Sequence, residues 1–175
     1  MEAFGTDTDW YLAHPATAWT ARMPDDRAAA VRMAAGVMEL VLPEWRTARP
    51  QDAVPLRAVE AALSDPSGAD AGLRLHAKAL AKGCGESRRR SMGFEHRIAE
   101  AARALANAAA ASSDAAAMEA VAEALGKVEE HLLYRLAVAG VYGRVVEVRG
   151  HMLRRALTVG SPDAEPGSVL SRGDS

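Results

Sequence analysis

The chain has 175 residues, which is enough for one domain whose core buries most of its apolar surface. Alanine accounts for 39 residues and aromatics for only 5%, and because alanine has the highest helix propensity this composition favours an all-α fold. Cys84 is the single cysteine, which excludes a disulfide framework, and a net charge of −2 argues against a strongly basic nucleic-acid-binding protein.

The first clear helix follows Pro24. Asp25 and Asp26 can accept hydrogen bonds from the free N–H groups of a first turn, as residues at helix starts do. Apolar residues then recur at intervals of three or four, at Val31, Ala34, Met38, Val41, Leu42 and Trp45. Pro43 lacks an N–H group and its ring crowds the preceding turn, so we expect this helix to kink or end near Leu42 and a polar crossing to follow.

A second helix is expected from Asp52, which can cap it, with Pro55 in the first turn where proline is tolerated. Its buried stripe contains Leu56, Val59 and Leu63. The two helices would form a helical hairpin across the polar crossing. Residues 64–68, with the sequence Ser-Asp-Pro-Ser-Gly, are typical of a turn and end the hairpin.

The third expected helix covers residues 69–82 and ends at Gly83. Its inward positions are Leu73, Ala77 and Leu80, with His76 half-buried beside them. Residues 83–93 begin and end with glycine and contain three successive arginines, so we interpret them as an exposed loop.

Further helices are expected in the C-terminal half. The fourth covers residues 94–111, with Phe94, Ile98, Ala102, Leu105 and Ala109 on one face. The fifth, after a break at 112–114, has the most regular seam, formed by Met118, Val121, Leu125, Val128 and Leu132. A sixth carries Val141, Val145, Val148, Met152, Ala156 and Val159. The periodicity predicts a compact all-α bundle of about five to seven helices, built from helical hairpins in one domain over residues 1–159, with a disordered tail at 160–175.

The sequence lacks the residue patterns that are typical of catalytic and cofactor sites. His96 with Glu100, and Glu147 with His151, have the i,i+4 spacing that places two side chains on one helix face, but the Glu-x-x-His pairs of di-iron bundles are absent. His131 follows two glutamates and is expected in solvent. We expect a protein without enzymatic activity, metal or cofactor, and a metal-dependent helical-bundle enzyme that uses these pairs is an alternative.

Guanidinium groups bind phosphate through paired hydrogen bonds, so phosphate binding is one interpretation of the run Arg88, Arg89 and Arg90. Nucleic acid is disfavoured as a partner because aromatic residues do not alternate with the basic ones.

The longest apolar region, residues 132–148, is interrupted by charged residues and glycines, which argues against a membrane span. The N-terminus lacks the pattern of a signal peptide, so a cytoplasmic protein is expected.

Three short runs within residues 31–63 are distinctive. They are Val41-Leu42-Pro43-Glu44-Trp45, Arg49-Pro50-Gln51-Asp52 and the helix start from Pro55 to Ala62. Together they resemble the immunity proteins of bacterial polymorphic toxin systems. The resemblance implies an all-α protein that neutralises a cognate toxin by binding it, without chemistry of its own. A helical scaffold that self-associates through its alanine-rich faces is the alternative.

A partner surface is expected at the crossing after Pro43. Its residues are Glu44, Trp45, Arg46, Arg49 and Asp52. They combine an aromatic side chain with arginines and acids, the composition that binding hot spots favour. Trp45 has a second interpretation, because it can also continue the buried stripe of the first helix. The run Arg88, Arg89 and Arg90 is the second candidate surface.

Overall fold

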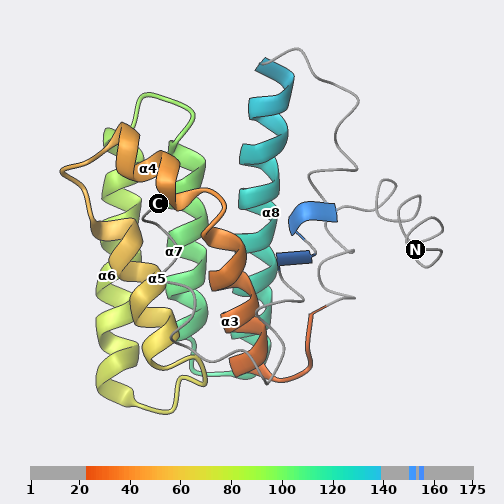
Figure 1. The fold of residues 1–175 in the computed structure, drawn as a ribbon. Coiled ribbons are helices and arrows are strands. Elements are labelled where there is room, and N and C mark those ends of the chain that lie inside the picture. Colours follow the sequence, from red (N-terminus) through yellow and green to blue (C-terminus); the bar gives the residue numbers. More distant parts are fainter. Residues whose placement is uncertain (1–22, 139–149, 153, 156–175) are drawn as a thin grey trace, which may run out of the picture.

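The computed structural model describes residues 23–138, 150–152 and 154–155, and within these ranges the regular structure is entirely helical. The helices are α3 (Arg27–Met38), α4 (Leu42–Ala48), α5 (Val54–Ser64), α6 (Ala71–Arg90), α7 (His96–Ala110) and α8 (Asp114–Val138). They pack into one bundle, which confirms the all-α fold (Figure 1). The expected tail at 160–175 and most of the expected sixth helix lie outside the described residues.

Helix α7 is the centre of the bundle and contacts α3, α5, α6 and α8 (Figure 1). Nine of its 15 residues are buried, and seven of those nine are alanines. Because a methyl side chain lets helix axes approach closely, an alanine-rich helix can be covered on several sides without leaving voids. The alanine content of the chain thus serves packing inside the molecule.

The seam that the sequence predicts for the fifth helix is confirmed in α8, where Val121, Leu125 and Val128 are fully buried against the core. The core residues of α8 also include Ala117 and Ala124, which the predicted seam omits. Met118 and Leu132 lie at its half-buried flanks. Met152, from the segment beyond α8, is fully buried in the same core.

The start of helix α3 is joined to the C-terminal end of α7 by a buried arginine. As expected, α3 begins at an aspartate cap, since Asp26 accepts the N–H of Ala29 at 2.7 Å. In the first residue of α3, Arg27 donates from Nη2 to carbonyl oxygens at the C-terminal end of α7, those of Ala108, Ala109 and Ala111. These carbonyls have no partner within their own helix, so the guanidinium caps α7.

The predicted loop at residues 83–93 is wrong, because α6 continues without a break to Arg90. Gly83 does not end the helix. A Cβ atom on Gly83 would lie 2.9 Å from Cγ1 of Val54, so the glycine lets α5 approach α6. Packing against α5 thereby outweighs the low helix propensity of glycine. Cys84 is consequently buried inside the bundle, and burial raises the pKa of its thiol to about 12.

Several side chains that the helical stripes place inward are exposed. Leu63 at the end of α5 and Leu73 at the start of α6 lie at the ends of their helices, where the neighbouring helices no longer cover them. His76, expected to be half-buried, is also exposed on α6. The positions in the middle of each helix, such as Val59 and Ala77, are buried as predicted.

Candidate functional site

The crossing expected after Pro43 is itself a helix. Pro43 lies in the first turn of α4, where the missing N–H would have no intrahelical partner in any case, so it starts a new helix after the end of α3. The short helix lies at the end of the bundle where α6 connects to α7 (Figure 1). Its polar side chains reach that connection and α8, as the following contacts show.

Trp45 belongs to the core and not to the surface. Its side chain is fully buried, and its indole Nε1 donates to the backbone carbonyl of Asp52 at 2.7 Å. This bond fixes the connection between α4 and α5 from within. The prediction of Trp45 as a partner-binding residue is therefore wrong, and its alternative interpretation as part of the buried stripe is correct.

Glu44 reaches from α4 to α8. Its Oε2 lies 2.8 Å from Nε2 of His131 and 3.0 Å from Nη1 of Arg135. His131 is fully buried, with Nδ1 3.2 Å from the carbonyl oxygen of Phe94, so both ring nitrogens face acceptor oxygens. The expectation that His131 lies in solvent is wrong. Glu44 mainly holds α4 onto the bundle.

Arg49 forms a second contact of this kind. Its Nε donates to Oε1 of Glu95 at 3.0 Å, which ties the end of α4 to the connection between α6 and α7. Burial alone would raise the pKa of the Glu95 carboxyl. The hydrogen bond from its own backbone N–H and the contact with Arg49 outweigh that effect, and the pKa is lowered. Arg46, by contrast, is exposed.

Asp52 and the arginine run meet across α5 and α6. Oδ1 of Asp52 accepts the N–H of Val54 at 3.1 Å, and Oδ2 lies 3.6 Å from Nη2 of Arg90. Asp52 thus bonds the first residue of α5, although the residue at the cap position is Ala53, which makes no side-chain cap bond. Arg88 turns the other way and pairs with Glu100 on α7. Because successive residues on a helix point about 100° apart, the three arginines do not form a single cluster.

An exposed aromatic patch lies beside these contacts, at residues that the sequence does not single out. It consists of Met92, Phe94 and Tyr134 together with Arg97. Met92 is 94% exposed, Phe94 46% and Tyr134 36%. The rings of Phe94 and Tyr134 have centroids 4.7 Å apart, and the guanidinium carbon of Arg97 lies 4.8 Å above the Tyr134 ring. We refer to these four residues as the aromatic patch.

Periodicity alone assigned Phe94 to the buried face of the fourth helix. In the structure Phe94 precedes α7, which begins at His96, so that face does not extend to it. Tyr134 and Arg135 are exposed near the C-terminal end of α8. A sequence signal was available, since Met92, Phe94 and Arg97 occur within the seven residues after the arginine run, but it does not reveal that Tyr134 joins them.

The described residues contain no group of three or more histidine, cysteine, aspartate or glutamate side chains that could hold a metal ion. His96 lies with Nδ1 3.0 Å from the carbonyl oxygen of Gly93, while Glu100 pairs with Arg88 and Lys127. Of the second pair, Glu147 lies outside the described residues. Among the helices of the described residues, none is long and apolar enough to cross a bilayer.

Comparisons with known proteins identify no relative. A scan against protein-family models, a search of curated proteins and a search of solved structures each return no match.

Proposed function

We propose that this protein is a protein-binding module whose contact surface is the aromatic patch. The observation that carries the proposal is the exposure of Met92, Phe94 and Tyr134 on the same end of the bundle, with Arg97 stacked on the tyrosine. Tyrosine, phenylalanine, methionine and arginine are enriched in protein interfaces, and an aromatic side chain already held by a neighbour loses little conformational entropy on binding.

The surroundings of the patch favour a partner with acidic groups around an apolar centre. Arg46 and Arg89 are exposed at this end of the bundle, and so is Arg135, which is also paired with Glu44. Glu44 and Glu95, in contrast, are already paired with His131 and Arg49 inside the fold. Exposed arginines around an apolar centre give selectivity and faster association through electrostatic complementarity.

The resemblance of residues 31–63 to immunity proteins supports a particular class of partner. On this proposal the partner is a toxin encoded next to the gene, and the protein neutralises it by binding without catalysis. The alternative of a scaffold that self-associates through alanine-rich faces is less favoured, because the alanines of α7 already pack inside the bundle.

The test uses the product of the neighbouring toxin-like reading frame. Co-expression should restore the growth of cells that this product otherwise inhibits, and calorimetry should detect a stable complex of the two purified proteins. Replacing Phe94 and Tyr134 together by alanine should weaken the complex by roughly 30-fold or more, the loss of a hot spot. The helical melting curve should keep its cooperative shape, since neither ring belongs to the fully buried core.

The matched control is Leu75→Ala. Leu75 is 70% exposed on α6 and lies outside the patch, so its loss should leave the affinity within about twofold. A complex of unchanged affinity in the folded double variant would refute the patch as the binding surface. The absence of any complex with the neighbouring gene product would refute the immunity role.

A further inference from the structure

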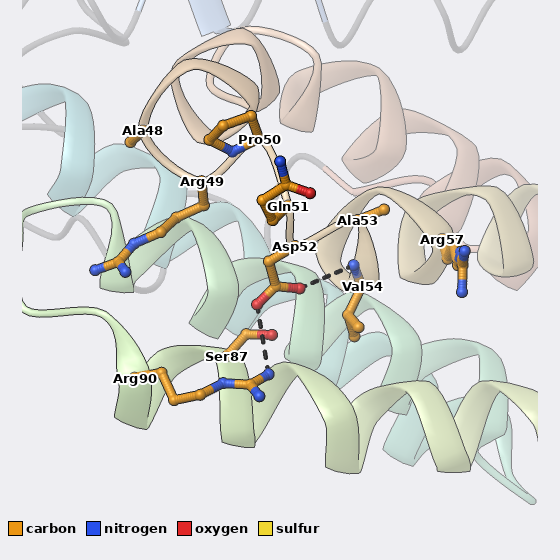
Figure 2. Close-up of a pocket in the computed structure, with 10 residues that line it drawn as sticks. All are labelled: Ala48, Arg49, Pro50, Gln51, Asp52, Ala53, Val54, Arg57, Ser87 and Arg90. Carbon is orange, nitrogen blue, oxygen red and sulfur yellow. Dashed lines mark hydrogen bonds and ion pairs between the residues drawn. The ribbon is translucent and has the colours of Figure 1, made fainter.

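A pocket of about 590 Å³ opens between the α4–α5 connection, the first turn of α5 and the last turns of α6 (Figure 2). Its size falls within the range of small-molecule sites. The pocket is separate from the aromatic patch, and none of the patch residues lines it. Pro50, Val54 and the alanines beside them supply apolar wall, and charged side chains supply the rest.

The charge of the lining is positive. Arg49, Arg57 and Arg90 face a single acid, Asp52, which leaves a formal excess of two positive charges. Arg49 is engaged by Glu95, but the guanidinium of Arg57 is exposed and makes no hydrogen bond or ion pair with the part of the chain that the structure describes. Arg90 touches Asp52 only at 3.6 Å through one nitrogen, so most of its N–H groups are available.

A second and independent feature is the hydroxyl of Ser87. The side chain is only 1% exposed, and its Oγ has no hydrogen-bond partner in the described structure. Ser87 lines the pocket one helical turn before Arg90 (Figure 2). The carboxylate of Asp52, which also lines the pocket, accepts the N–H of Val54 through Oδ1 and makes no hydrogen bond with Ser87. A buried hydroxyl without a partner is rare in folded proteins and marks a place where an acceptor atom belongs.

From these features we infer that the pocket binds a small phosphorylated ligand, with its phosphate held by Arg90 and the hydroxyl of Ser87, whereas Arg57 lies apart from them beyond Val54 (Figure 2). Because Arg49 is paired with Glu95, the lining keeps one unopposed positive charge, which attracts an anion, and the oxygens of a phosphate can accept from both guanidinium and hydroxyl donors. A volume near 590 Å³ leaves room for an organic body beyond the phosphate. The carboxylate of Asp52 carries a negative charge that repels the phosphate, so binding requires the arginines to outweigh it.

Inorganic phosphate and a simple phosphate monoester are the probes, titrated into the full chain and followed by calorimetry and by amide chemical shifts at residues 48–57 and 87–90. The arginine variant Arg90→Gln should weaken binding by roughly tenfold or more, because it removes charged hydrogen bonds. Arg89→Gln is the matched control. It removes the same charge from the next position, which does not line the pocket, and should change the affinity by less than about twofold.

Two further variants separate binding from folding. Ser87→Ala removes the unpartnered hydroxyl, so the melting temperature should stay the same or rise while phosphate affinity falls by roughly threefold to tenfold. Asp52→Asn can still accept the Val54 N–H but loses the opposing charge, so phosphate should bind more tightly. An unfolded or loosened variant cannot gain affinity, which makes this increase diagnostic.

The inference is overturned by any of three results. These are the absence of phosphate and monoester binding at concentrations up to about 10 mM, an equal loss for Arg89→Gln and Arg90→Gln, and unchanged affinity in Ser87→Ala. An equal loss would show attraction to the basic end of α6 in general. Binding of the monoester but not of inorganic phosphate would support the pocket and assign affinity to the organic body as well.

Discussion

Gly68 and Arg27 should stabilise the bundle as a pair, and Gly68→Ala tests this directly. Gly68 has a φ of +66°, in the left-handed region that glycine adopts freely and alanine does not. A Cβ atom there would lie 2.1 Å from Nη2 of Arg27 and 2.5 Å from its Cζ. The guanidinium would have to move, and it is the group that caps the end of α7.

The expected loss follows from two contributions. Alanine in the left-handed region costs about 1–2 kcal/mol. Nη2 of Arg27 lies 2.9–3.2 Å from three carbonyl oxygens at the end of α7, and losing a hydrogen bond to a charged group costs about 1.5–3 kcal/mol. The three contacts share one nitrogen, so we count them as one or two bonds. Gly68→Ala should lower the free energy of unfolding by about 3–5 kcal/mol.

Urea denaturation followed by circular dichroism measures the loss, and a double-mutant cycle separates its parts. In an Arg27→Met background no guanidinium remains to be displaced, so Gly68→Ala should cost only the backbone contribution of about 1–2 kcal/mol. Gly126→Ala is the control, because a Cβ on Gly126 of α8 meets nothing within 4 Å, and it should stabilise by about 0.5–1 kcal/mol. Equal losses in both backgrounds would refute the coupling between Gly68 and Arg27.

Three further outcomes are expected. Leu125→Ala should cost about 2–5 kcal/mol in urea denaturation, because Leu125 is fully buried, and a loss well below 1 kcal/mol would make α8 peripheral. Cys84, with a thiol pKa raised by burial to about 12, should react with a thiol reagent at pH 8 roughly a hundredfold more slowly in the native protein than in urea, and equal rates would contradict its burial. Burial alone would raise the pKa of Asp65, but hydrogen bonds from the backbone of Asp70 and Ala69 outweigh it and lower the pKa below 3.8. The ionised carboxylate therefore stabilises the fold above pH 3.8, and this contribution is lost as the pH falls through the lowered pKa. In Asp65→Asn the free energy of unfolding should consequently fall less steeply at acidic pH than in the unaltered protein. An unchanged dependence of the free energy of unfolding on acidic pH would contradict this.

The features predicted correctly from the sequence are those decided by nearby residues. The Asp26 cap and the turn that ends at Gly68 depend on local chemistry, and both occur as expected. The helical stripes predict the middle of each helix well, as Leu125 shows. The end of α6 could not be predicted in this way, because the helix at Gly83 is stabilised by Val54, which lies about thirty residues away in the chain.

His131 shows a signal that was present but misinterpreted. Its neighbours Glu129 and Glu130 suggested solvent, yet the alternating steps of four and three through Ala117, Val121, Ala124 and Val128 lead to position 131. All of these positions are buried. A histidine at this place in a seam needs partners for its ring nitrogens, and those partners come from α4 and from the α6–α7 connection. Their identity is a property of the tertiary fold alone.

The partner-binding residues predicted from the composition of the crossing after Pro43 include several that hold the fold together, which affects how binding can be tested. Trp45, Glu44 and Asp52 make contacts that hold α4 and the start of α5 in place. Reversing the charge of Glu44 would leave the buried His131 facing a lysine, so a loss of affinity in such a variant would not distinguish a damaged fold from a damaged interface. The rings of Phe94 and Tyr134 lie outside the core cluster and pack on each other, with Arg97 above the tyrosine, so they hold no helix in place in this way. The stretch that resembles immunity proteins thus acts as the support on which the proposed surface is built, and only substitutions in the aromatic patch test binding by itself.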